Sequence, residues 1–172
     1  ILIEHLRDHK TRRTAFSDVV KAYSEPLYWH IRRMVLNHDD ANDLLQNTFI
    51  KAWTGIDGFL GNSKVLTWLY RIATNETITF LNRTNTVVIE EPESCATQLE
   101  ADTYFDGDSL QTRLQEAIQT LPPKQRMVFN MKYYDDMKYE EISSILGTSI
   151  GALKASYHLA VKKISSFFDD DI

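Results

Sequence analysis

Apolar residues recur every three or four positions through most of this 172-residue chain. That spacing places side chains on one face of an α-helix. The pattern is clearest over residues 14–35, and it returns at 44–53, at 65–83 and from 110 onward. No segment alternates apolar and polar residues in the manner of a strand, and no internal repeat is present. The sequence therefore predicts an all-α fold.

Residues that interrupt this pattern predict where the helices of the first half begin and end. Pro26 is expected to divide the stretch 14–35 into two helices, because a proline ring fits at a helix start. Asp39 or Asp40 is a suitable N-cap for the next helix. The apolar face expected of that helix is formed by Leu44, Leu45, Phe49, Ile50 and Trp53. Three glycines mark the loop after it: Gly55, Gly58 and Gly61.

The middle of the chain has a different composition and predicts a linker between two domains. Residues 84–109 show no sustained period and contain no basic residue after Arg83. We therefore expect one helical domain at 1–85, an acidic linker at 86–109 and a second helical domain at 110–172. In the second domain one helix is expected to carry Leu110, Leu114, Ile118 and Leu121 on its apolar face. The next is expected to begin at Pro122-Pro123 and to carry Met127, Val128, Met131 and Tyr134.

Charge is unevenly distributed, and this matters more than the net charge of −5. Residues 1–85 carry net +2, residues 86–110 net −7 and residues 111–168 net +3. Two mildly basic segments that flank an acidic one indicate a charged partner. The single cysteine, Cys95, excludes an internal disulfide, and no metal-ligand spacing or cofactor motif accompanies it. With no secretory signal and no membrane-length apolar run, a cytoplasmic protein is expected.

The most specific local motif lies near the C-terminus and predicts a helix-turn-helix. Residues 139–146 form a short helical pattern that Gly147 can end in a left-handed conformation, and Thr148 or Ser149 can cap a second helix from about Ile150 to Phe167. Its buried side is expected to hold Ile150, Leu153, Tyr157, Ala160, Val161 and Ile164. Its outer side is expected to hold Ser149, Ala152, Lys154, Ala155, Ser156, His158, Leu159 and Lys162. Small residues, hydrogen-bond donors and lysines suit a DNA recognition helix. An αα-hairpin with solvated lysines has the same pattern and stays open on these residues alone.

Two long segments in this order resemble the extracytoplasmic-function (group four) sigma factors of the sigma-70 family. LPPKQRMVFNMKYYDDMKYEEISSILGTSIGALKASYHLAVKKI is similar to their region four, and DDANDLLQNTFIKAWTGIDGFLGNSKVLTWLYRIATNETITFLNR is similar to their region two. The resemblance covers roughly 14–83 and 110–167. It implies a non-enzymatic initiation factor that binds core RNA polymerase and recognises and melts promoter DNA. Region two would bind the −10 element and region four the −35 element. It also implies an anti-sigma factor as a further partner.

The resemblance assigns roles to particular residues of this chain. The polar contacts to the polymerase β′ clamp helices would come from Asp43, Gln46, Asn47 and Lys51. The −10 element would be contacted by Phe59, Asn62, Arg71 and Asn75, whereas Trp68 and Tyr70 are expected in the core. The −35 element would be contacted by Ser149, Lys154, Ser156, His158 and Lys162, with Lys124 and Arg126 on flanking phosphates.

Six positions depart from the family pattern. Asn47 replaces the usual Glu of the clamp contact, and Leu60 and Asn62 replace the Arg and Asp of the −10 loop. In region four, Lys154-Ala155-Ser156 replaces Lys/Arg-Ser-Arg, and Leu159 stands where many members have Arg. Fewer basic groups imply weaker −35 binding and a shallower salt dependence.

Other functions fit parts of the sequence. A helix-turn-helix regulator that acts without polymerase would use region four and leave the 43–53 helix unexplained. The pair His38-Asp39 occurs in metal phosphohydrolases, but the other histidines propose no completing ligands. The acidic linker is either a mimic of RNA in the polymerase exit path or a spacer that sets the reach between domains.

Overall fold

A computed structural model of the chain describes residues 2–35, 37–59, 61, 63–84 and 109–169. Within these ranges every regular element is helical, so the all-α prediction is confirmed. The predicted linker, apart from Ser109, lies outside the described residues. In the described part, no helix is both long enough and apolar enough to span a bilayer.

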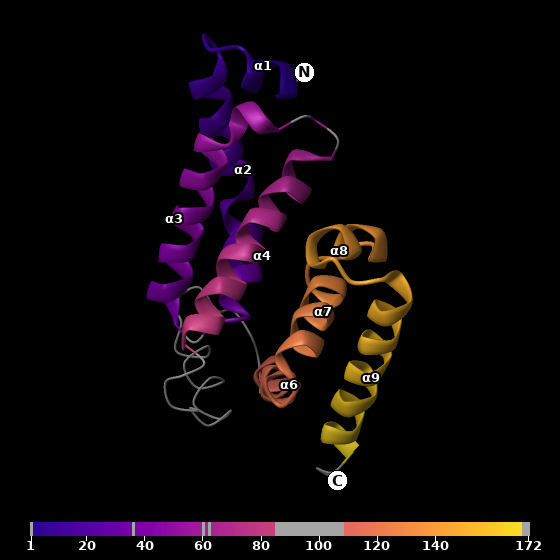
Figure 1. Cartoon of the computed structure of the whole chain (residues 1–172). Coiled ribbons are helices and arrows are strands. Elements are labelled where there is room, and N and C mark those ends of the chain that lie inside the picture. Colours follow the sequence, from indigo (N-terminus) through magenta and orange to yellow (C-terminus); the bar gives the residue numbers. More distant parts are fainter. Residues whose placement is uncertain (1, 36, 60, 62, 85–108, 170–172) are drawn as a thin grey trace.

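The first group of helices, which we call the N-terminal unit, precedes the linker. It consists of α1 (Leu2–Arg7), α2 (Arg12–Arg32), α3 (His38–Thr54), a 3₁₀ turn η1 (Ile56–Gly58) and α4 (Val65–Thr84). In Figure 1, α2, α3 and α4 run side by side along the unit, and α1 lies across one end. Their shared core includes Leu27, Ile31 and Leu69, none of which is exposed. Burial of these side chains is what holds the three long helices together.

The expectation that Pro26 divides the second helix is wrong. α2 continues from Arg12 to Arg32 with Pro26 inside it. An internal proline removes one backbone hydrogen bond and costs about 3 kcal/mol. The neighbours Leu27 and Ile31 are fully buried. Burying each such side chain contributes roughly 1.5–3 kcal/mol, which offsets the lost bond.

The N-cap of α3 also differs from the expectation. Asn37 is the cap, and its side-chain oxygen accepts a hydrogen bond from the Asp40 backbone N–H over 2.9 Å. Asp39 and Asp40 lie in the first turn instead, where their negative charges favour the positive end of the helix dipole. Asn is as good a cap as Asp, so local preference alone did not distinguish the three positions.

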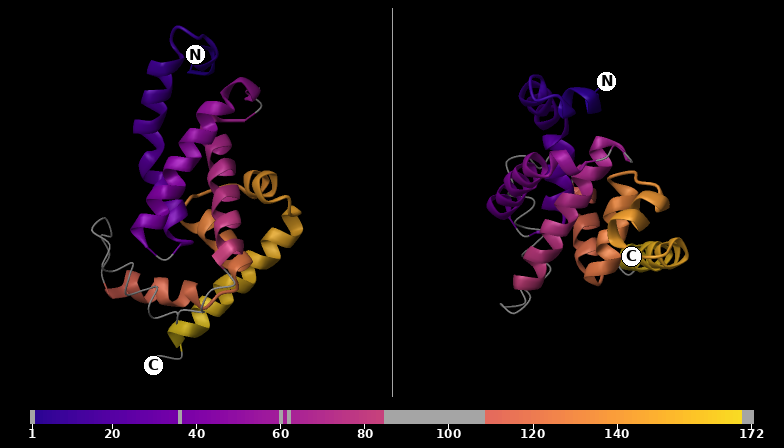
Figure 2. Two further views of the ribbon diagram at one scale, coloured as in Figure 1. Left: turned by 60° about the vertical axis from the view of Figure 1, so that its left-hand side comes forward. Right: turned by 45° about the horizontal axis from the view of Figure 1, so that its top comes forward.

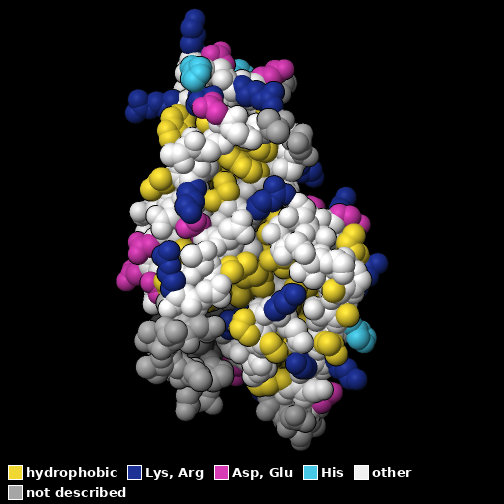
Figure 3. Space-filling model, viewed as in Figure 1, with side chains coloured by type: hydrophobic (Ala, Val, Ile, Leu, Met, Phe, Trp, Pro, Cys, Tyr) yellow, Lys and Arg dark blue, Asp and Glu magenta, His cyan; other side chains and the backbone are white. Residues whose placement is uncertain are grey.

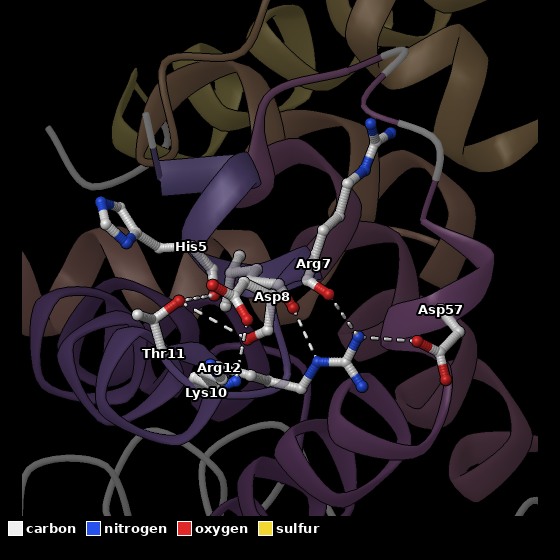
Figure 4. Close-up of polar contacts among 8 residues, drawn as sticks. His5, Arg7, Asp8, Lys10, Thr11, Arg12 and Asp57 are labelled. Atoms are coloured by element: carbon white, nitrogen blue, oxygen red, sulfur yellow. Dashed lines mark hydrogen bonds and ion pairs between the residues drawn. The ribbon is translucent and has the colours of Figure 1, made fainter.

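Arg12 fixes α1 against the loop that follows α3, as Figure 4 shows. Its guanidinium donates to the carbonyl oxygens of Leu6 (2.7 Å) and Arg7 (3.2 Å) and to the Asp57 carboxylate (2.7 Å). Unpaired carbonyls at a helix C-terminus need such donors. A Cβ added to Gly61 would lie 3.5 Å from the Ile3 side chain, so α1 also packs on the loop itself.

The second group, the C-terminal unit, follows the linker. It consists of α6 (Ser109–Gln119), α7 (Pro123–Tyr133), α8 (Tyr139–Leu146) and α9 (Ile150–Asp169). Its own core contains Ile118, Leu121, Phe129, Ala160 and Ile164. The predicted helix starting at Pro122-Pro123 is confirmed, with Pro122 as N-cap and Pro123 as the first helical residue. Proline suits this place because the first N–H groups of a helix have no partner within it.

Four apolar residues that we expected on buried faces are exposed. Ile50 is 60 % exposed, Trp53 41 %, Leu110 61 % and Val161 39 %. Helical spacing predicts which residues share a face, but not how far neighbouring elements cover that face.

The two units pack against each other. Figures 1 and 2 place α7 and α8 beside α4, and Figure 3 shows hydrophobic side chains along the line where the units meet. One continuous apolar cluster includes residues of both, among them Met34 and Leu69 from the first and Met127, Met131 and Ile142 from the second. We call this contact the seam.

The turn between α8 and α9 gives a prediction about stability. Gly147 has φ +68°, and a Cβ there would meet no atom within 4 Å. Gly147→Ala is therefore expected to cost about 1–2 kcal/mol through backbone strain alone. Gly151→Ala, also in open space but inside α9, should instead stabilise the chain by about 0.5 kcal/mol. Urea unfolding of both variants checks this, and equal effects would contradict it.

Candidate polymerase and nucleic-acid interfaces

α8, Gly147 and α9 form the predicted helix-turn-helix. Gly147 ends α8 in the left-handed conformation, and its N–H bonds to the Ser143 carbonyl. The Ser149 hydroxyl then accepts from the Ala152 N–H over 3.3 Å and caps α9. Leu153, fully buried, anchors the start of α9 against α7 and α8. The helix that follows is therefore held in a fixed orientation.

One side of α9 presents polar groups to solvent. Lys154, His158 and Lys162 are all exposed, and their spacing of four residues puts them in one row. Tyr157 is packed as expected, with its ring stacked on Phe129 at a centroid distance of 5.8 Å. The row offers two cations and an imidazole in a line about 12 Å long, since each residue rises 1.5 Å.

The other residues expected at the −35 element are placed differently. Lys124 is exposed at the start of α7. Ser156 is half-buried and, two positions from Lys154, points away from the exposed row. Arg126 donates to the Gln119 side chain and has a buried Nε, so it joins α6 to α7. Both side chains are thus less exposed than the row formed by Lys154, His158 and Lys162.

The outer face of α3 combines polar groups with exposed apolar side chains. Asp43, Gln46 and Asn47 are exposed, as predicted from the sequence. Lys51 is exposed as well, and its amine pairs with Glu76 of α4. Ile50 lies three or four residues beyond Gln46 and Asn47, which puts it on the same face.

Trp53 extends this face. It is 41 % exposed and contacts Phe16 of α2 edge-on, with 5.2 Å between ring centroids. Sequence reasoning missed Ile50 and Trp53 as surface residues because it assigned them to the buried stripe. Ile50 follows Asp43 by seven residues and Trp53 follows it by ten. These spacings place both side chains near the exposed face that carries Asp43, and they could have identified them as surface residues.

The loop before α4 and the start of α4 hold the residues expected to contact the −10 element. Phe59 is only 7 % exposed and stacks on Trp68 at 4.6 Å, so its ring supports the loop from inside. Tyr70 is buried, as expected. Asn75 is exposed on α4, and Arg71 donates to the Ser144 hydroxyl of α8. Asn62 lies outside the described residues.

The His38-Asp39 pair forms no metal site with other described residues. Nδ1 of His38 lies 2.8 Å from the Tyr28 hydroxyl. In the part of the chain that the structure describes, no group of three His, Cys, Asp or Glu side chains is arranged to hold a metal ion. The histidine ring therefore packs α3 against α2.

Comparisons with known proteins identify the family. Residues 19–86 match the family described as Sigma-70 region 2, and residues 111–164 match Sigma-70, region 4. The ECF RNA polymerase sigma factor SigW of Bacillus subtilis (strain 168) is 35 % identical, over 87 % of this chain and 86 % of its own length. This chain is an extracytoplasmic-function sigma factor. Its family acts with RNA polymerase in promoter-specific transcription initiation.

Further relatives are similar in sequence to this sigma factor over nearly its whole length. The ECF RNA polymerase sigma-E factor of Escherichia coli (strain K12) is 28 % identical over 96 % of the chain and 92 % of its own length. Two solved structures share the fold at 23 % identity. They are sigma factor RpoE with the anti-sigma factor NepR from Bartonella quintana (TM-score 0.72, 91 % and 98 % coverage) and CnrH with the cytosolic domain of CnrY (0.75, 99 % and 97 %).

Proposed function

We propose that this sigma factor docks on the β′ clamp of core RNA polymerase through the outer face of α3. It then reads the −35 element with α9 and captures unstacked −10 bases with the loop 59–63 and α4. The single observation that carries the proposal is the exposed row Lys154, His158 and Lys162 on a helix held by a capped, glycine-ended turn. Such a helix can enter a major groove without rearrangement.

The face of α3 has the composition of a docking surface. Stable interfaces place apolar and aromatic side chains at the centre and polar groups at the rim. Here Ile50 and Trp53 supply exposed apolar area, and Asp43, Gln46 and Asn47 supply polar contacts beside them. We propose that Ile50 is the main apolar anchor and that Asp43 provides the charge that orients the docking.

The −10 contact rests on α4. Unstacking a base costs a few kcal/mol, which hydrogen bonds to its Watson–Crick edge and stacking contacts must offset. The Asn75 side chain is exposed and can both donate and accept. Arg71, at the preceding turn, is positioned for a phosphate once Ser144 is displaced. The Phe59 ring is buried and stacks on Trp68, so we propose that it holds the loop in place and does not itself contact a base.

The −35 contact predicts a measurable salt effect. Lys154→Ala should remove one phosphate contact, weaken promoter binding of the holoenzyme at all −35 sequences and reduce the slope of log K against log salt by about one. Lys163→Ala is the matched control, because that lysine is exposed on another side of α9 beside Gln125. Promoter titrations at several salt concentrations measure the slope for each variant. Equal slopes for Lys154→Ala and Lys163→Ala would show that Lys154 does not contact a phosphate of the −35 element.

Association with core polymerase tests the proposal against its main alternative. The purified chain should co-elute with core polymerase and shift a promoter-length duplex only in that complex. A helix-turn-helix regulator acting alone would shift an operator duplex without polymerase and would not co-elute with it. The α3 face supports the first outcome, because a lone regulator has no use for exposed Ile50 and Trp53.

An anti-sigma factor is the second partner we propose. Two structures of similar fold are those of sigma factors held by NepR and by CnrY. In this chain, a partner that covers exposed Ile50 and Trp53 would compete directly with polymerase for the same apolar area.

A further inference from the structure

The excess positive charge of the N-terminal unit is concentrated at the end that α1 covers. Residues 1–13 carry four basic and two acidic side chains, whereas residues 14–84 carry seven of each. Figure 3 shows basic side chains around this end of the molecule. The exposed basic side chains of this segment are Arg7, Lys10 and Arg13, which we call the α1 patch. Its charge indicates an anionic partner.

Hydrogen bonds fix the turn that carries the α1 patch, as Figure 4 shows. The Asp8 carbonyl accepts from the N–H groups of Thr11 (3.1 Å) and Arg12 (2.8 Å). The Asp8 carboxylate accepts from the Lys10 N–H over 2.9 Å. The Thr11 hydroxyl donates to the His5 carbonyl over 2.8 Å. Because this backbone is already ordered, a ligand that binds here has to order only the ends of the side chains.

The same end of the unit is joined to the loop that precedes α4. The Arg12 guanidinium bridges the carbonyls at the end of α1 and the Asp57 carboxylate of η1. A Cβ added to Gly61 would lie 3.6 Å from a terminal nitrogen of Arg7, so the Arg7 guanidinium lies beside the loop backbone. Gly61 belongs to the loop that we assign to the capture of −10 bases. A strand held by that loop is therefore within reach of Arg7.

The side chains of the α1 patch favour phosphate as the ligand. Arginine presents a fork of N–H donors that fits phosphate oxygens, and lysine adds a mobile point charge. A protein interface or a base-stacking surface would need exposed apolar or aromatic side chains. In the described part of the chain, the large apolar side chains that are exposed belong to α3, α6, α7 and α9, and none belongs to α1 or the turn after it. The patch thus suits sequence-independent contacts to a nucleic-acid backbone.

We propose that the α1 patch binds phosphates of the single strand whose bases the loop before α4 captures, so that the −10 interface extends from α4 over the loop onto α1. This inference rests on the proposed function, because the loop brings the strand to α1. The contacts hold the separated strand by its backbone, and they act at every promoter because phosphates carry no sequence information. Each lysine or arginine that neutralises a phosphate of a single strand contributes about 0.7 to the slope of log K against log salt.

Removal of one charge from the α1 patch tests its contact with DNA. Lys10→Gln keeps a long polar side chain at an exposed turn position, so the helical circular dichroism should be unchanged. Promoter binding by the holoenzyme should weaken about two- to fivefold, with a salt slope shallower by about 0.7. Adding Arg13→Gln should produce a similar change again. Lys21→Gln is the matched control, because it removes an exposed charge about 13 Å from the start of α2 and should change neither quantity.

Neutral methylphosphonate linkages locate the phosphate that the α1 patch binds. One linkage at a time is replaced along the strand at and beside the −10 element of a promoter that the holoenzyme opens. At the contacted position, the replacement should weaken wild-type binding and leave binding by Lys10→Gln unchanged, because that contact is already lost. A merely structural role for Lys10 would give no such position. That result, or equal salt slopes for Lys10→Gln and Lys21→Gln, would overturn the proposal.

A random-sequence single strand of about 20 nucleotides separates this inference from the proposed function. If the wild-type holoenzyme opens no promoter, the proposed function fails, and binding of this strand to the full chain still tests the α1 patch. Weaker binding by Lys10→Gln but not by Lys21→Gln would support the phosphate contact, and equal binding by wild type and Lys10→Gln would overturn it. Vesicles of anionic phospholipid test another polyanion. Vesicle binding that Lys10→Gln abolishes, with DNA binding unchanged, would assign the patch to a membrane surface and overturn the proposal.

Discussion

Asp43→Arg is expected to abolish binding to core polymerase. Asp43 is exposed on the α3 face that we assign to the clamp, next to Gln46 and Asn47 and about two turns from Ile50. Reversing this charge replaces an attraction with a repulsion at the interface and should weaken binding about 100-fold or more. A titration of core polymerase with the labelled variant measures the loss.

Folding must be separated from binding in that experiment. Asp18→Arg makes the same charge change at an exposed position of α2 and should bind polymerase like the wild type. Both variants should keep their helical circular dichroism, because neither side chain is buried. Tight binding of polymerase by Asp43→Arg would contradict the assignment of the polymerase contact to the outer face of α3.

Leu153→Ala is the second large effect expected, and it acts on stability. Leu153 is fully buried where α9 meets α7 and α8, and truncating such a side chain costs about 2–5 kcal/mol. Domains of this size are stable by only about 5–15 kcal/mol. α9 should therefore lose much of its protection against hydrogen exchange, and specific −35 binding should fall with it.

Leu159→Ala is the control for this effect. Leu159 is on the same helix but is 47 % exposed, so its truncation should change the free energy of unfolding by less than about 0.5 kcal/mol. Amide exchange of the N-terminal unit, α1–α4, should be preserved in both variants. Similar costs for Leu153 and Leu159 would mean that α9 is not anchored as described.

Local signals predicted much of the C-terminal unit. Gly147 ends one helix because it adopts φ +68°, and Ser149 caps the next through its hydroxyl. Both are properties of single residues and their near neighbours, so sequence reasoning reached them. The same holds for Tyr157, whose register in α9 indicated packing before the Phe129 contact was seen.

Features that depend on distant packing were not predictable in this way. α2 continues through Pro26 because Leu27 and Ile31 are buried by other helices. Ile50 has an ordinary position in an apolar pattern, yet its side chain is left 60 % exposed by the described helices. The contact between His30 and Asp135 is the extreme case, since the two residues are 105 positions apart in the sequence. Their contact exists only once both units have folded and met.

Transcription from a defined template tests the central claim most directly. Core polymerase is given a linear promoter template with and without the purified chain, and run-off transcripts are resolved by length. We predict one discrete transcript that requires the chain, with permanganate-reactive thymines near its start showing melted DNA. Transcripts that are identical with and without the chain, and no reactive thymines, would contradict the account.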